Sequence, residues 1–122
     1  MDSRIKREVL IIAADCVVGA LLGVLVEISG DQARFSEVGE TPRAAIERLR
    51  APLVLIDCDH DVACEDTAYE AASRTGSEVI LFGHEKDRER IISMGKQRDV
   101  YTLSLPVDPA ALGRLIDHVL AA

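Results

Sequence analysis

Leu53-Val54-Leu55-Ile56-Asp57 is a run of four apolar residues that ends on a carboxylate. Such a run, with no polar alternation, is typical of a strand that helices cover on both faces of a sheet. Two further apolar runs, at residues 9–13 and 79–82, flank it at distances that leave room for helices. The sequence therefore predicts a parallel sheet in which residue 57 lies at the end of a central strand.

Segments with helical periodicity separate these runs. One helix is expected within residues 14–28, and others at about 41–49, 63–74, 85–96 and 108–120, with shorter strands at 33–37 and 100–104. Thr41-Pro42 and Asp108-Pro109 each place a capping side chain before a proline at the first helical position. The alternation predicts an α/β fold, a flavodoxin-like doubly wound five-stranded parallel sheet of order 2-1-3-4-5 with five helices. In that topology the ligand site lies at the carboxyl ends of strands one and three.

Composition narrows the functional classes. The 122 residues suit one domain, expected over 1–122. A net charge of -7 disfavours nucleic acid and anionic membranes as partners. The apolar run 9–28 contains Asp15, which disfavours a membrane span. A reducing compartment, the cytoplasm, is expected because no CxxC pair occurs among Cys16, Cys58 and Cys64.

The strand pattern, Asp57 after the third strand and Pro106 before the last helix together resemble the receiver domains of bacterial response regulators. The resemblance covers nearly the whole chain. It implies a signalling role in a two-component phosphorelay, in which Asp57 matches the residue that accepts a phosphoryl group from a histidine kinase. It also implies a cis Leu105–Pro106 bond and no enzymatic activity.

Four features that support phosphorylation in receiver domains are altered here. The acidic pair that holds Mg²⁺ in the family aligns with Ala13 and Ala14, which have no side-chain oxygen. The positions of the family's phosphoryl-binding hydroxyl, its lysine and its switch aromatic align, in that order, with Gly83, Leu105 and Thr102.

Each lost charge-assisted contact removes about 1.5–3 kcal/mol, so phosphorylation would change the relative stability of two states little. We therefore interpret the chain as an atypical receiver, a pseudo-receiver that acts by protein–protein interaction with weak or no phosphorylation at Asp57. The alternative is a functional receiver in which Asp15 or Asp59 helps Asp57 and binds Mg²⁺ weakly. Capping the first helix is the competing role for Asp15.

Two other interpretations concern residues 57–64, the segment that begins at Asp57. Asp57-Cys-Asp-His-Asp-Val62 resembles the DxDxV motif of haloacid-dehalogenase-like phosphatases, so a small phosphate-ester hydrolase is a minor alternative. The motif lies on the third strand, whereas those enzymes carry it on the first. No established zinc spacing links Cys58, His60, Cys64 and His84. We expect Cys58 to be a small core residue and His60 to lie in a solvated loop.

The first helix has an unusually apolar outer face. Its core-facing residues are expected to be Val18, Leu21, Leu22 and Leu25. The outward positions, where a solvated helix would carry charges, are then Val17, Gly19, Ala20, Gly23 and Val24. We expect this patch to mediate a homodimer or to dock a partner helix. The protein partner expected for the domain is a histidine kinase, an output domain or a second copy. The expected contact residues are Val17, Ala20 and Val24.

Overall fold

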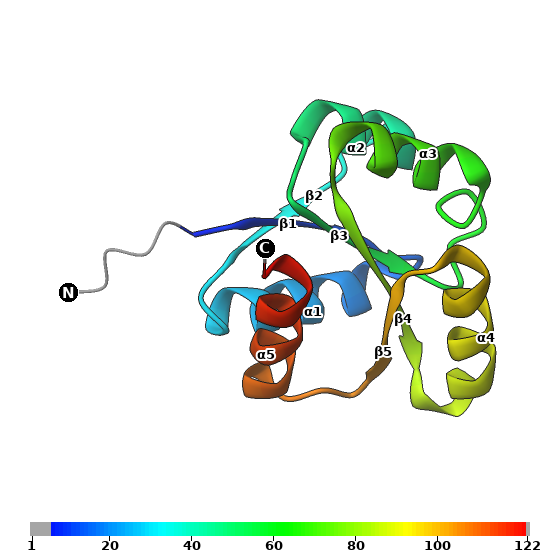
Figure 1. Ribbon diagram of the computed structural model, residues 1–122. Coiled ribbons are helices and arrows are strands. Elements are labelled where there is room, and N and C mark those ends of the chain that lie inside the picture. Colours follow the sequence, from blue (N-terminus) through cyan, green and yellow to red (C-terminus); the bar gives the residue numbers. More distant parts are fainter. Residues whose placement is uncertain (1–5, 122) are drawn as a thin grey trace.

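The computed structural model describes residues 6–121, which form one five-stranded sheet flanked by helices (Figure 1). All neighbouring strands are parallel, in the order β2-β1-β3-β4-β5. The strands are β1 (Glu8–Ile12), β2 (Gln32–Phe35), β3 (Leu53–Asp57), β4 (Glu78–His84) and β5 (Tyr101–Leu105). The predicted topology is confirmed, although β2 is shorter than the 33–37 expected.

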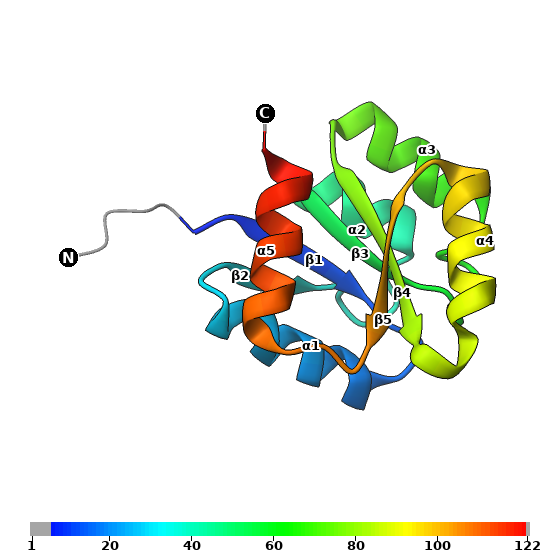
Figure 2. The same cartoon turned by 60° about the horizontal axis from the view of Figure 1, so that its bottom comes forward.

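Helices cover both faces of the sheet. They are α1 (Cys16–Ile28), α2 (Pro42–Leu49), α3 (Asp66–Thr75), α4 (Arg88–Arg98) and α5 (Pro109–Leu120), with a 3-10 turn η1 (Glu85–Asp87) before α4. Helices α1 and α5 lie side by side on one face, and α2, α3 and α4 cover the other (Figures 1 and 2). Within the described part of the chain, no helix is long and apolar enough to cross a membrane.

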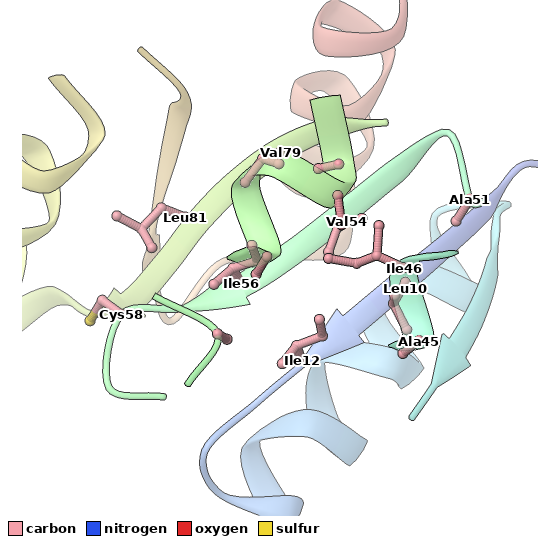
Figure 3. Close-up of a cluster of buried hydrophobic side chains, with 14 of the residues drawn as sticks. Leu10, Ile12, Ala45, Ile46, Ala51, Val54, Ile56, Cys58, Val79 and Leu81 are labelled. Atoms are coloured by element: carbon pink, nitrogen blue, oxygen red, sulfur yellow. The ribbon is translucent and has the colours of Figure 1, made fainter. Parts of the chain in front are cut away.

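The central strand β3 shows why continuous apolar runs form this fold. Successive side chains of a strand point to opposite faces of its sheet. Leu53 and Leu55 pack in the layer with α1 and α5, whereas Val54 and Ile56 pack in the layer with α2 and α3 (Figure 3). All four are 0% exposed. Each such buried side chain stabilises the fold by about 1.5–3 kcal/mol.

Local signals place several helix ends as expected. The Thr41 hydroxyl accepts a hydrogen bond from the Ala44 amide at 3.1 Å, and the Asp108 carboxylate accepts one from the Ala111 amide at 2.8 Å. The Leu105–Pro106 bond is cis, as the resemblance implied. The helix expected at 85–96 is instead divided into η1 and α4, and the His84 side chain caps η1 by accepting a hydrogen bond from the Lys86 amide. Likewise α3 begins at Asp66, later than expected.

The orientation of α1 differs from the prediction. Leu21 was expected in the core but is 62% exposed, and Gly19 and Gly23 face the sheet instead of the outside. A Cβ on Gly23 would lie only 2.7 Å from Cζ of Phe35, and one on Gly19 would lie 3.2 Å from Cβ of Ala13. The two glycines therefore let α1 rest close to β1 and β2. This contact rotates the helix and turns Leu21 outward.

Candidate functional site

Asp57 lies at the carboxyl end of β3, between β1 and β4, and is 6% exposed. Its Oδ2 accepts a hydrogen bond from the Ala14 amide, and its Oδ1 accepts one from the Asp59 amide, each at 2.9 Å. The β1–α1 and β3–α3 loops thus meet on this carboxylate. The structure places Asp57 at the edge of the sheet where the topology predicts a ligand site.

The β1–α1 loop contributes a backbone donor to the site and no side-chain oxygen at its first two positions. Ala13 is half-buried and Ala14 is exposed. Asp15 turns its carboxylate to α1, where Oδ1 accepts hydrogen bonds from the amides of Val17 at 2.7 Å and Val18 at 3.4 Å. The helix-capping role considered for Asp15 is confirmed.

Asp59 forms an ion pair with Arg90 of α4. The same guanidinium lies 3.5 Å from Sγ of Cys58. Sequence reasoning missed Arg90, because residues 85–90 alternate in charge and were interpreted as a solvated helical face. No local spacing signals a contact between residues that lie 31 positions apart.

The donor set fits Mg²⁺ poorly. Ligand atoms of Asp57, Cys58 and Asp59 lie within 4.8 Å of one another. Mg²⁺ requires oxygen ligands in near-octahedral geometry, yet one donor here is sulfur and another already binds Arg90. Burial raises the pKa of the Cys58 thiol to about 11, which leaves it protonated at neutral pH. The metal-binding roles considered for Asp15 and Asp59 stay predictions that this geometry does not favour.

Gly83, which the resemblance aligns with the receiver hydroxyl, lies in β4 beside the site. A Cβ added there would lie 2.6 Å from Sγ of Cys58 and 2.8 Å from Cδ1 of Ile91. Both neighbours are buried, and Cys58 is the small core residue expected from the sequence (Figure 3). The space for a hydroxyl side chain is therefore filled by the core.

Strand β5 contributes apolar contacts to the site. Leu105, which the resemblance aligns with the receiver lysine, is half-buried and packs against the α1/α5 core layer. Thr102 faces α4, where a Cβ on Gly95 would collide with its methyl group. Tyr101 is 43% exposed and contacts the ring of His118 edge-on at 5.6 Å, so it faces the other side of the strand, as predicted.

The four residues considered for a zinc site, Cys58, His60, Cys64 and His84, do not form a metal-binding cluster among the described residues. Nδ1 of His60 accepts a hydrogen bond from the Ala63 amide at 3.1 Å, and the Cys64 thiol donates to the carbonyl oxygen of Asp57 at 3.3 Å. His60 is half-buried, which is less exposed than expected. Over residues 6–121, the acidic and thiol side chains of 57–59 form the sole cluster of three metal-ligating groups.

A groove of about 670 Å³ opens beside Asp57, between α1 and the β5–α5 connection. At the carboxyl end of the sheet its lining includes Asp15, Asp57 and Asp59, together with Ala14, Phe82, Gly83 and His84. The sides of the groove are apolar along both elements, and the residues that form them are Val18, Leu21, Val24, Leu25, Leu105, Pro106 and Val107. Sequence reasoning identified the acidic end but not the groove.

Comparison with known proteins shows the fold. No protein-family model and no curated protein sequence matches the chain. Solved structures match at low sequence identity. The receiver domain of a sensor histidine kinase from Pseudomonas aeruginosa PAO1, with a magnesium ion coordinated in its active-site cleft, is 17% identical with a TM-score of 0.71, covering 97% of this chain and 100% of that one.

Two further structures agree. A response regulator receiver protein from Burkholderia phymatum is 18% identical with a TM-score of 0.73, covering 94% of this chain and 95% of that one. NtrX from Brucella abortus in complex with ADP is 16% identical with a TM-score of 0.75 over 95% of this chain, which spans only 26% of that protein. The fold is that of the response-regulator receiver domains.

Proposed function

We propose that the chain is an atypical receiver-like signalling domain of the cytoplasm that acts by protein–protein contact, with weak or no phosphorylation at Asp57. One observation carries the proposal. The phosphoacceptor position is retained, but the places that would stabilise a phosphoryl group hold an alanine at 14, a glycine enclosed by core atoms at 83 and a leucine at 105.

Phosphorylation of Asp57 would gain few new contacts in this structure. A two-state element responds to a ligand only through interactions that differ between its states. At Asp57 the nearby donors are backbone amides, which already bind the unmodified carboxylate. A phosphoryl group would find no ammonium at Leu105 and no hydroxyl at Gly83. We therefore expect phosphorylation to shift the conformational equilibrium little, and we expect no catalytic turnover.

Treatment with acetyl phosphate and Mg²⁺, and separately with beryllofluoride, tests this proposal. We expect intact-protein mass spectrometry to show no adduct on Asp57. Asp57→Asn is the matched control, because an adduct on Asp57 would be absent from this variant. A stable adduct on Asp57 would instead support a functional receiver. Continuous release of phosphate that depends on Asp57 would support the phosphate-ester hydrolase. Either result would overturn the proposal.

The contact surface proposed for signalling is the α1 stripe, formed by Val17, Ala20, Leu21, Val24 and Ile28. Its four large side chains are 63%, 62%, 55% and 63% exposed in chain order. They are spaced by four, three and four residues, which aligns them along one face of the helix. Glu27 is the single charged residue of α1. Val17, Ala20 and Val24, the contact residues expected from the sequence, are exposed.

A second copy of the chain is the partner that this pattern favours. The spacing is symmetric about the midpoint of the stripe, so two antiparallel α1 helices would place Val17 against Ile28 and Leu21 against Val24. Isologous contacts require such self-complementarity. The four side chains expose on the order of 400 Å² per copy, about half of the roughly 800 Å² that a standard interface buries on each partner. The flanking groove residues can supply the remainder.

Sedimentation velocity over a concentration series tests the homodimer. We expect concentration-dependent dimerisation that Val17→Glu and Ile28→Glu abolish. Val38→Glu, at a fully exposed residue outside the stripe, is the matched control. Because each copy carries a net charge of -7, added salt should strengthen the dimer by screening repulsion. A monomer at all concentrations would refute the second copy as partner and leave a kinase or output domain to be tested on the same stripe.

A further inference from the structure

The groove beside Asp57 combines apolar walls with an acidic end. Its volume of about 670 Å³ lies within the usual size of small-molecule sites, roughly 300–1,000 Å³. Leu21, Val24 and Leu25 form part of its α1 side, and Leu105 and Val107 part of the opposite side. An apolar ligand body would therefore lose contact with water on two sides.

The acidic end carries a charge without an ionic partner. Among residues 6–121, Asp57 forms no ion pair, whereas Asp59 is already paired with Arg90. The two backbone amides leave acceptor positions on the Asp57 carboxylate unused, because a carboxylate can accept about four hydrogen bonds. A buried carboxylate of this kind gains most from a charged donor.

We propose that this groove binds a small amphipathic organic cation, an ammonium or guanidinium group on an apolar body. The cationic group donates hydrogen bonds to Asp57, and the body lies between α1 and the β5–α5 connection. Leu105 contributes to this selectivity, because it lines the same groove as Asp57 and offers apolar surface with no charge of its own. A hydrated divalent cation gains nothing from such walls and finds a poor donor set.

Cation binding in the groove is a separate property from the proposed signalling contact, but the two surfaces share residues. Leu21 and Val24 belong both to the groove wall and to the α1 stripe. A cation held in the groove therefore contacts the surface proposed for the second copy. Ligand binding and dimerisation can still be tested separately, because Val17 and Ile28 do not line the groove.

The probe for this site is n-hexylammonium, with 1-hexanol as a neutral control of matched length. In a ¹H–¹⁵N titration of the full chain at pH 7, we expect saturable shifts of the Ala14 and Asp59 amides, which donate to Asp57. The ammonium should bind about tenfold or more tightly than the alcohol, the advantage typical of a charge-assisted hydrogen bond.

Two variants identify the groups responsible. Asp57→Asn should bind the ammonium and the alcohol equally. Leu105→Lys supplies an internal ammonium and should remove ammonium binding, whereas Leu105→Met, which keeps the wall apolar, should retain it. The dispersion of each spectrum shows whether a variant is folded. If Asp57→Asn unfolds, the lysine and methionine pair decides the question.

Equal affinity of the wild-type chain for ammonium and alcohol would overturn the proposal. So would ammonium binding that survives Leu105→Lys unchanged. These readouts are independent of phosphorylation: an Asp57 adduct with acetyl phosphate would refute the proposed function, and the titration would still report whether the groove binds a cation.

Discussion

Substitution of Gly83 by alanine tests whether the core closes the space beside Asp57. The added Cβ would lie 2.6 Å from Sγ of Cys58 and 2.8 Å from Cδ1 of Ile91, closer than nonbonded carbon contacts allow. Cys58 is 5% exposed and Ile91 is 0% exposed, so neither can move into solvent. Such overpacking destabilises a core by about 1–3 kcal/mol, which lowers the melting temperature of a domain of this size by roughly 4–12 °C.

Urea and thermal unfolding, followed by circular dichroism, measure this loss. Combining Gly83→Ala with Cys58→Ala removes the closest contact, so the double variant should be more stable than the sum of the single effects predicts, by about 0.5 kcal/mol or more. Gly113→Ala is the comparison variant, because its added Cβ would meet a milder contact, with Cβ of Ser29 at 3.3 Å. Stability of Gly83→Ala within about 0.5 kcal/mol of wild type, the range of neutral surface changes, would refute the reasoning.

Three further predictions use groups outside the groove. Tyr69→Phe should leave stability unchanged or raise it by up to about 1 kcal/mol in urea unfolding, because its buried hydroxyl has no hydrogen-bond partner within residues 6–121; a clear loss of stability would contradict this. Iodoacetamide at pH 8 should alkylate exposed Cys16 before Cys58, since burial raises the pKa of the Cys58 thiol to about 11; mass spectrometry showing the reverse order would exclude that environment. The hydrogen bond from Arg48 lowers the pKa of Glu40 to about 2. The Glu40–Arg48 pair therefore stabilises the fold above the ordinary carboxyl pKa of about 4.3, and this contribution is lost as the pH falls toward 2. Glu40→Gln should reduce the pH dependence of unfolding over that acid range, and identical pH profiles for the two proteins would show that the pair contributes nothing.

The altered receiver positions differ in how much the sequence alone revealed. Ala13, Ala14 and Leu105 were informative as residue types, because a methyl or isobutyl group cannot bind a metal or neutralise a phosphoryl group. For Gly83, the sequence showed only that the residue has no hydroxyl group. The structure adds that its space is filled, so a single substitution to serine or threonine cannot restore the group without displacing Cys58.

The first helix shows where sequence reasoning failed. Periodicity identified α1 but not its rotation, because every residue from Cys16 to Val26 is uncharged and small and large apolar side chains can each face a sheet. Shape decided the question: Gly19 and Gly23 fit against Ala13 and Phe35. The resulting rotation of α1 exposes Leu21, which lies in the α1 stripe.

The sequence by itself determined the α/β topology, the starts of α2 and α5 and the place of Asp57 at the edge of the sheet. These features depend on hydrophobic periodicity and capping, which act between residues that are close along the chain. Only the tertiary structure decided the rotation of α1, the pairing of Asp59 with Arg90 and the groove beside Asp57. Each of these depends on how side chains from distant segments fit together, and close packing is a property of the folded chain.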